Sequence, residues 1–407
     1  MVRAIVGTQF GDEGKGRAIE FLAPNAQVIA RYQGGANAGH TIHINEESII
    51  FHLVPSGIIY PHTLCIIGNG VALDPAELIK EIEVLKEKKV SVEGRLFISP
   101  YAHVVMPYHK MSDDIRGNLG TTKRGIGPCY EDKYARRGIR VADLLSPKIL
   151  EEKLRHNFLI HQLTDKSFNL EFNSIYEQYL TFGNILQPFI ADTSLLLNRW
   201  IDEGKEVLLE GAQGLLLDID HGTYPFVTSS NPHSGGASIG LGISPTRIDE
   251  VIGITKAYTT RVGKGPLPTR LPSEIEEKVR EQGKEYGATT GRPRRCGWLD
   301  VPLLRRALML NDIKRIILTK FDVLDELSEI KICKEYKNMS TEWYANFEDL
   351  EPVYEVLPGW KSSTQNIRKY EDLPVNARRY IKRISELLEV SIIAVFVGPQ
   401  KEATIGL

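Results

Sequence analysis

The sequence predicts an α/β protein in which a large, mainly parallel central sheet is flanked by helices. Several short apolar runs end in glycine or in a polar loop, and helical patterns lie between some of them. Buried parallel strands have this continuous apolar character, and strands that alternate with helices favour an open parallel sheet. A glycine-dense loop after the first run resembles the phosphate loop of nucleoside triphosphatases. We therefore expect ligand loops at the carboxyl ends of the strands.

The apolar runs that we expect to form strands are spread over the whole chain. Among them are Val2–Val6, Leu64–Ile67, Leu96–Ile98, Val207–Leu209, Ile316–Leu318 and Ile392–Val397. One helix has a clear start, because Asp74 is a suitable N-cap, Pro75 suits the first helical position and Glu77 makes the first turn acidic. This helix should run to about Lys89.

The stretch from Ser146 to about Gly204 has a different character. It is rich in helical patterns, contains few glycines and carries no motif. We expect residues 146–204 to form a helical insertion packed on the sheet, within a single domain that spans residues 1–407. A second, separable domain is the alternative.

Composition restricts the partners of the chain. Its 407 residues carry a net charge of −2, so no overall attraction to nucleic acid or to anionic membranes is expected. No apolar run approaches the roughly 20 residues that cross a bilayer, and residues 1–9 lack the apolar core of a signal peptide. The four cysteines show no metal-ligand spacing, which indicates reduced thiols in a cytoplasmic protein.

The loop at residues 7–16 is the strongest local signal. Its glycines let backbone N–H groups approach phosphates, and Lys15 would reach the terminal phosphate oxygens. The loop departs from the usual G-x-x-x-x-G-K-[ST] pattern, because Gln9 stands at the first glycine and Gly16 replaces the hydroxyl that binds Mg²⁺. A metal ligand must then come from elsewhere, and Asp12 is the obvious carboxylate. The alternative is a glycine-rich turn that binds nothing.

This loop belongs to a series of motifs that together resemble the adenylosuccinate synthetase family. They run in family order across nearly the whole chain, so a chance match to all of them is implausible. The motifs are Gly7–Gly16 (GTQFGDEGKG), Arg31–Thr41 (RYQGGANAGHT), Gly120–Pro128 (GTTKRGIGP), Glu210–Gly214 (EGAQG), Gly222–Asn231 (GTYPFVTSSN), Gly287–Trp298 (GATTGRPRRCGW) and Leu318–Asp322 (LTKFD).

The resemblance implies a ligase of purine nucleotide synthesis that joins L-aspartate to inosine monophosphate (IMP) at the expense of GTP. The products would be adenylosuccinate, GDP and phosphate, formed through a 6-phosphoryl-IMP intermediate with one Mg²⁺ per subunit. Asp12 would be the general base and His40 its catalytic partner, while Asp12 and the backbone carbonyl of Gly39 would bind the metal. The resemblance also implies a homodimer in which Arg136 reaches the IMP of the neighbouring subunit.

Three sets of binding residues follow from the family positions. The GTP set is Gly11, Asp12, Glu13, Gly14, Lys15, Gly16, Arg17, Gly39, His40, Thr41, Arg294, Lys320, Phe321, Asp322, Phe396, Val397 and Gly398. The IMP set is Asp12, Glu13, Gly14, Lys15, Asn37, Ala38, Gly39, His40, Thr122, Arg136, Gln213, Thr228 and Arg292. The aspartate set is Ala288, Thr289, Thr290, Gly291, Arg292, Pro293 and Arg294. For Asn37, Thr122, Gln213 and Thr228, helix caps or turn hydrogen bonds are the alternative.

Two of these segments have a chemical argument of their own. Asp322 follows an apolar run, and its carboxylate can accept from both N1–H and the exocyclic amine of guanine, whereas adenine offers no such pair. The segment 288–295 places three arginines beside a glycine and a proline. Arginine forks pair bidentately with carboxylates, of which L-aspartate brings two. The lack of helical spacing favours a mobile loop over a merely solvated charged face.

Some positions depart from the commonest family pattern, namely Arg17, Glu20, Ala36 and Phe396. The main rival function is a GTPase switch or nucleotide-binding regulator, which would use the same phosphate loop and base-reading motif. That rival leaves the arginine loop and the segment 37–40 unexplained. A nucleotide-gated scaffold without chemistry would leave Asp12 and His40 without a task.

Overall fold

The centre of the molecule is a nine-stranded sheet of order β19-β18-β15-β11-β1-β10-β2-β6-β8. The computed structural model describes residues 1–44, 47–115, 120–164, 168–287, 291–337 and 347–407, and only the backbone of residues 41–44, 47, 48, 115 and 348. The strands of this sheet are β1 (Val2–Gly7), β2 (Val28–Arg31), β6 (Leu64–Ile67), β8 (Leu96–Ile98), β10 (Val207–Glu210), β11 (Glu250–Lys256), β15 (Arg315–Thr319), β18 (Ser391–Phe396) and β19 (Thr404–Gly406). Every pair is parallel except the edge pair of β18 and β19. The predicted α/β fold and its expected strands are confirmed.

Eleven helices are described around the sheets. They are α1 (Lys15–Leu22), α2 (Pro75–Glu87), α3 (Pro107–Ile115), α4 (Ile126–Tyr134), α5 (Pro147–Thr164), α6 (Phe172–Leu186), α7 (Thr193–Asp202), α8 (Ser234–Leu241), α9 (Ser273–Gly283), α10 (Val301–Leu310) and α11 (Val375–Leu388). Within the described ranges, none of them combines the length and the apolar character that crossing a membrane requires.

The helix predicted to begin after Asp74 is α2. The Asp74 carboxylate accepts hydrogen bonds from the N–H groups of Ala76 at 3.2 Å and Glu77 at 3.5 Å, as an N-cap does. The helix ends at Glu87, slightly before the expected Lys89, because Lys89 adopts a left-handed conformation with φ of 60°.

Four small sheets surround the large one. Their strands are β3 (Gly34–Gly35), β7 (Val71–Leu73) and β9 (His103–Val104); β4 (His40–Ile44) and β5 (Glu47–Phe51); β12 (Thr259–Arg261) and β13 (Arg295–Gly297); and β14 (Leu299–Asp300), β16 (Glu329–Tyr336) and β17 (Pro352–Pro358). The antiparallel pairing of β12 with β13 matters for the site, because it brings the arginine-rich segment before Arg295 against the chain that leaves β11.

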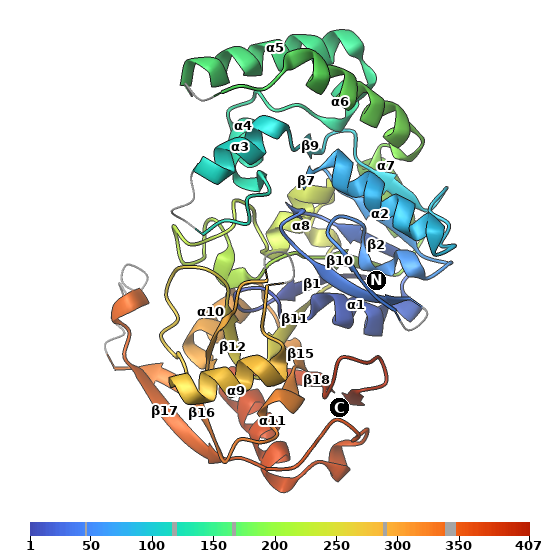
Figure 1. Cartoon of the computed structure of the whole chain (residues 1–407). Coiled ribbons are helices and arrows are strands. Elements are labelled where there is room, and N and C mark those ends of the chain that lie inside the picture. The colour runs from blue at the N-terminus through green and yellow to red at the C-terminus, as the bar shows by residue number, and fades with distance from the viewer. Residues whose placement is uncertain (45–46, 116–119, 165–167, 288–290, 338–346) are drawn as a thin grey trace.

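Residues 146–204 contain α5, α6 and α7, as the helical pattern predicted. In Figure 1, α5 and α6 lie together at one end of the molecule, and β16 and β17 lie at the other end. Leu154, Phe158 and Tyr179 of the insertion share one hydrophobic core with Cys65 and Ile98 of the central sheet. The interpretation of residues 1–407 as a single domain stays a prediction.

The parallel register gathers the important loops at one edge of the sheet. Ile5 of β1 pairs with Glu210 at the end of β10, Gly7 pairs with Ile254 of β11, and Thr319 ends β15 opposite Lys256. The segments that follow β1, β10, β11 and β15 therefore leave the sheet side by side.

Candidate active site

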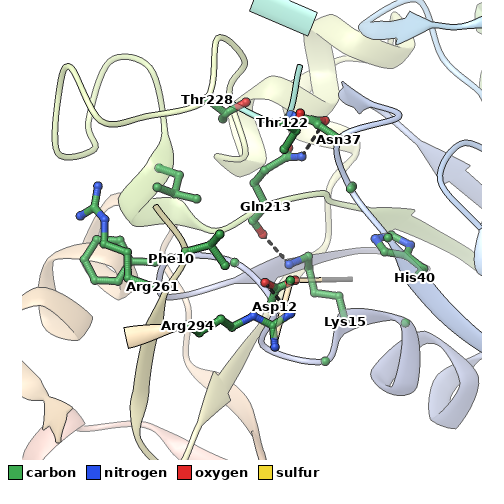
Figure 2. Close-up of a pocket in the computed structure, with 18 of the residues that line it drawn as sticks. Phe10, Asp12, Lys15, Asn37, His40, Thr122, Gln213, Thr228, Arg261 and Arg294 are labelled. Atoms are coloured by element: carbon green, nitrogen blue, oxygen red, sulfur yellow. Dashed lines mark hydrogen bonds and ion pairs between the residues drawn. The ribbon is translucent and has the colours of Figure 1, made fainter. Parts of the chain in front are cut away.

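A cleft of about 1600 Å³ opens at this edge of the sheet. The phosphate loop, the segment 37–40 and the ends of β10, β12, β15 and β18 all contribute to its wall (Figure 2). The predicted site residues that line it are Gly11, Asp12, Gly14, Lys15, Gly16, Arg17, Asn37, Ala38, Gly39, His40, Thr122, Gln213, Thr228, Arg294, Lys320, Asp322, Phe396 and Gly398. One cleft thus unites positions that are as much as 387 residues apart, from Gly11 to Gly398.

The phosphate loop is wrapped around its own carboxylate. Glu13 has no exposed surface and accepts hydrogen bonds from the N–H groups of Gln9 at 3.0 Å and Gly11 at 2.8 Å, and from Nζ of Lys15 at 2.8 Å. The Glu13 side chain therefore points away from the cleft, and Glu13 is not among the residues that line it. A Cβ atom at Gly7 would lie 2.1 Å from the Glu13 carboxylate, which explains the glycine there.

Lys15 and Asp12 present the functional groups of this loop. Lys15 begins α1 and lines the cleft, where Nζ also contacts the backbone oxygen of Gln213. Asp12 adopts a left-handed conformation with φ of 57°, and its side chain is 34% exposed. Oδ2 of Asp12 lies 2.9 Å from Nη2 of Arg294, so the expected base and an expected substrate-binding arginine form an ion pair.

His40 is held by a buried acid that the sequence reasoning did not single out. Nδ1 of His40 contacts Oε1 of Glu210 and lies 3.2 Å from Oγ of Ser56. Glu210 has no exposed surface and also accepts from the Ser56 N–H at 2.9 Å and hydroxyl at 2.6 Å. Burial alone would raise the pKa of Glu210, but His40 and Ser56 outweigh it and lower that pKa. The ionised carboxylate holds Nδ1 of His40 towards the protein interior. Nε2 is therefore the ring nitrogen available to a ligand in the cleft.

Two amides form the next part of the wall. Nε2 of Gln213 donates to Oδ1 of Asn37 at 3.1 Å, and Figure 2 shows Gln213 between this contact and Lys15. Oε1 of Gln213 is buried and has no hydrogen-bond partner among the described residues. A buried acceptor without a donor is uncommon in folded proteins, and this one lies against Gly34, where a Cβ atom would be 3.0 Å from Oε1. Thr122 and Thr228 add hydroxyls to the same part of the cleft.

The expected base-reading motif lies at another part of the cleft. Lys320 has φ of 56° and donates to the backbone oxygen of Gly283 at 2.6 Å. Burial raises the pKa of Asp322, whose Oδ2 accepts from Nε2 of Gln365 at 3.3 Å. Phe321 does not face the cleft, because it is fully buried and stacks on Trp360 with ring centroids 4.7 Å apart.

The departure at Phe396 is accommodated by packing. Its ring is 2% exposed and lies beneath the Arg17 guanidinium, whose central carbon is 4.4 Å from the ring centroid. Arg17 also donates to the backbone oxygens of Gln400 at 2.9 Å and Lys401 at 2.6 Å. Arg17 thus joins α1 to the C-terminal loop, while Val397 is fully buried and offers only its backbone.

Other predicted positions do not line the cleft of their own chain. Arg136 is exposed, has φ of 61° and follows α4. Arg292 donates to the backbone oxygen of Gly120 at 3.3 Å. Gly291 and Pro293 lie outside the lining as well. Ala288, Thr289, Thr290 and the side chain of Thr41 fall outside the part of the chain that the structure describes.

A magnesium ion fits this cleft only with help from a ligand. The described residues contain no group of three or more His, Cys, Asp or Glu side chains that could hold a metal. Mg²⁺ commonly binds through one or two carboxylates together with substrate phosphates and water. Asp12 offers one partly exposed carboxylate, and Gly39 lines the same cleft. These residues fit a Mg²⁺ ion that phosphate oxygens hold in part.

Comparisons with known proteins agree with the motifs. The family model described as adenylosuccinate synthetase matches residues 4–405. Adenylosuccinate synthetase of Caldanaerobacter subterraneus subsp. tengcongensis is 50% identical, over 100% of this chain and 99% of the relative. That of Thermodesulfovibrio yellowstonii is 49% identical, over 98% of this chain and 97% of the relative. The fully ligated adenylosuccinate synthetase of Plasmodium falciparum superimposes with a TM-score of 0.93 at 38% identity, over 100% of this chain and 99% of that one. The chain therefore belongs to the adenylosuccinate synthetase family, whose members are ligases that form a carbon–nitrogen bond.

Proposed function

We propose that this chain joins L-aspartate to IMP at the expense of GTP, giving adenylosuccinate, GDP and phosphate through 6-phosphoryl-IMP. The observation that carries the proposal is the single cleft, which holds a phosphate loop, a base-reading carboxylate and a separate wall of amides and hydroxyls. The first two suit a nucleoside triphosphate, and the third offers hydrogen bonds to a second, smaller nucleotide. Family membership supports the same reaction.

The proposed reaction has two steps. Asp12 removes the N1 proton of IMP, the electron pair moves to the 6-oxygen, and that oxygen attacks the γ-phosphorus while GDP leaves. The amine of L-aspartate then attacks C6, loses a proton and expels the phosphate. General-base help of this kind typically contributes about 10²–10⁴-fold. The imidazolium form of His40, with Nδ1 donating to Glu210, would donate a hydrogen bond from Nε2 to the 6-oxygen or to the GTP phosphate.

Positive groups would stabilise the transferring phosphate. Lys15 and the N-terminus of α1 meet the cleft at the phosphate loop. Asp12 and the backbone carbonyl of Gly39 would hold Mg²⁺. When bound, this ion would neutralise charge on the terminal phosphates of GTP.

The arginine segment would bind L-aspartate. Arg292 and Arg294 flank Pro293, and planar guanidinium groups match carboxylates with paired hydrogen bonds. Arg294 lines the cleft with its side chain 8% exposed, so its pairing with a substrate anion would be poorly screened by water.

A homodimer would complete the IMP site. Arg136 is exposed and does not line the cleft of its own chain, which suits an arginine that serves a neighbouring subunit. The IMP phosphate carries nearly two negative charges, and a charge-assisted bond is roughly twice as strong as a neutral one. Binding of IMP and dimerisation would then strengthen each other.

The rival interpretation, a GTPase switch, is tested by phosphate release. We expect phosphate release from GTP to require both IMP and L-aspartate. A switch would instead hydrolyse GTP in the absence of both compounds.

Asp12→Asn is expected to reduce turnover by about 10³-fold, because an amide cannot take the N1 proton. IMP binding and the melting temperature should change little, since the side chain is partly exposed. Asp312→Asn is the matched control, because Asp312 also has positive φ, at 49°, and its side chain is 85% exposed. Retention of a tenth of wild-type turnover would remove Asp12 from the role of base.

Asp322→Asn is expected to weaken the binding of GTP. It should improve the relative use of xanthosine triphosphate, because the 2-oxo group of xanthine can accept a hydrogen bond from the new amide. The change in the ratio of kcat/KM for the two nucleotides should be about 10²-fold. ATP serves as the internal control. An unchanged preference among the three nucleotides would show that Asp322 does not read the base.

Glu210→Gln is expected to lower kcat by about 10–100-fold while the KM values for GTP and IMP change less than about twofold. A carboxylate can only accept a hydrogen bond from Nδ1 of His40, whereas the neutral amide can also donate one. The variant therefore no longer restricts the proton to Nδ1. Glu206→Gln is the control on the same segment, since Glu206 is partly exposed and pairs with Arg3 at 3.0 Å. Wild-type kcat in the folded Glu210→Gln protein would contradict this positioning of His40.

Mixing inactive Arg136→Leu protein with inactive Asp12→Asn protein tests the shared site. Half of the randomly formed dimers would be mixed, and each would hold one intact site, so about a quarter of wild-type activity should return. Exchange of subunits is followed with two fluorescent labels. If labels exchange and activity stays absent, Arg136 serves its own subunit or no site.

A further inference from the structure

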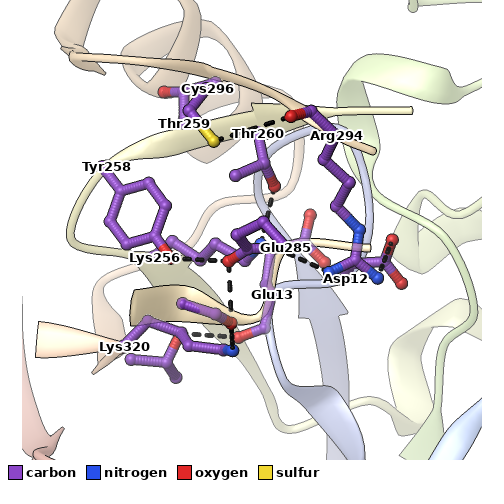
Figure 3. A network of polar contacts seen from close by, with 12 residues as sticks. Asp12, Glu13, Lys256, Tyr258, Thr259, Thr260, Glu285, Arg294, Cys296 and Lys320 are labelled. Atoms are coloured by element: carbon purple, nitrogen blue, oxygen red, sulfur yellow. Dashed lines mark hydrogen bonds and ion pairs between the residues drawn. The ribbon is translucent and has the colours of Figure 1, made fainter. Parts of the chain in front are cut away.

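Glu285 is a fully buried carboxylate that does not line the cleft and has no part in the steps above. It follows α9 and accepts hydrogen bonds from Nζ of Lys256 at 2.9 Å to each oxygen, from the hydroxyl of Tyr258 at 2.5 Å and from Nη1 of Arg294 at 2.6 Å (Figure 3). Nζ of Lys320 lies 3.9 Å from Oε1. Three cations therefore converge on one acid.

The partners of Glu285 come from different functional segments. Lys320 stands two residues before the base-reading Asp322. Arg294 belongs to the arginine segment and, through its other terminal nitrogen, pairs with Asp12 at 2.9 Å. A continuous line of charged contacts thus runs from Lys320 through Glu285 and Arg294 to Asp12.

The charge state of this network is well defined. Burial would raise the pKa of Glu285, but the adjacent Lys256, Lys320 and Arg294 lower it to about 2. The carboxylate stays ionised at neutral pH, and the pairing is lost only as the pH falls towards about 2. Charges in such a buried setting interact more strongly than they would in water.

A purely structural role would need fewer partners. Lys256 is as buried as Glu285, also donates to Thr260 at 2.6 Å, and together with Tyr258 already supplies three hydrogen bonds to the acid. Lys320 and Arg294 are additional, and they are the two cations of this network that line the cleft. Arg294 donates directly to the carboxylate, whereas Nζ of Lys320 donates to the backbone oxygen of Gly283 and interacts with Oε1 as an ion pair at 3.9 Å.

We infer that Glu285 is a positioning residue that couples the nucleotide-base end of the cleft to the phosphate loop, because its carboxylate binds Arg294 directly and attracts Lys320 at 3.9 Å. The inference rests on the proposed binding of the base at Asp322 and of the phosphates at the loop that carries Asp12. A base bound against Lys320 would favour the arrangement of Glu285 that aims Arg294, and the coupling is reciprocal.

Glu285→Gln is expected to raise the KM for GTP about fivefold and to lower kcat about tenfold, with the KM for IMP within about twofold of wild type. A merely structural role would lower the concentration of folded enzyme and the melting temperature, but would leave the KM values unchanged. Glu281→Gln on α9 is the matched control, because Glu281 is exposed and pairs only with Tyr286 among the contacts described here.

Loss of the acid leaves Lys256 buried beside a neutral group, which can prevent folding. The double variant Lys256→Met/Glu285→Gln removes both charges of that pair and keeps Arg294 and Lys320. The same rise in the KM for GTP and fall in kcat are expected in it. Normal kinetic constants in the folded double variant would overturn the inference.

The coupling itself is measured with Lys320→Met, Glu285→Gln and their combination, in the wild-type and the Lys256→Met backgrounds. The combined loss in kcat/KM for GTP should be at least about threefold smaller than the product of the single losses. A combined loss equal to that product would overturn the inference. The nucleotide preference of Asp322→Asn distinguishes failure of the base assignment from failure of the coupling inference. If it changes the nucleotide preference while Glu285 and Lys320 act independently, the inference alone is wrong. If it leaves the preference unchanged, the base assignment is wrong and the inference falls with it.

Discussion

Three groups in the wall of the cleft, Lys15, His40 and Arg294, are each held by a fully buried carboxylate. Glu13 stands behind Lys15, Glu210 behind His40 and Glu285 behind Arg294, and none of the three acids has exposed surface. An isolated buried charge is expensive, so each acid must be matched by several donors at short distances. That requirement restricts the positions of the donors as well as those of the acids. Two of the donors are backbone N–H groups of the phosphate loop.

The same constraint explains residue choices at a distance from the reaction. A Cβ atom at Gly214 would lie 2.4 Å from Oε1 of Glu13, much as one at Gly7 would meet Oε2. Glycine at both positions lets β1, the loop and the chain after β10 close around the acid. With Glu13 turned inward, Asp12 is the acidic residue of this loop that lines the cleft. The loop thereby offers the carboxylate of Asp12, whereas Gly16 occupies the position where phosphate loops usually have a hydroxyl.

The sequence predicted the sheet and the main motif segments of the cleft wall, because both depend on local signals. Apolar runs mark the strands, Asp74 marks the start of α2, and glycine-rich motifs mark the loops. Glu210 and Glu285 were missed in the sequence analysis, although Glu210 lies inside the motif Glu210–Gly214. Glu210 meets His40 across 170 residues of chain, and such a contact follows from the strand order, which local patterns do not contain.

The direction of individual side chains in the site was the second feature that could not be predicted from the sequence. Motif membership placed Glu13, Phe321 and Val397 in the site, but all three side chains are buried away from the cleft. Contacts within the protein determine these directions. The Glu13 carboxylate accepts a hydrogen bond from the N–H of Gly11 in the loop, and the Phe321 ring stacks on Trp360. A motif predicts which segment borders the site. The packing of the folded chain determines which atoms of that segment can contact a ligand.

Exposure also determines where substrate anions can compete for Arg294. Its two acidic partners differ, since Glu285 is sealed in the interior and Asp12 is 34% exposed. Water screens the Asp12 pair, and its separation costs little desolvation, whereas breaking the Glu285 pair would leave a buried charge unmatched. A phosphate or a carboxylate entering the cleft would therefore displace Asp12 and leave Glu285 in place.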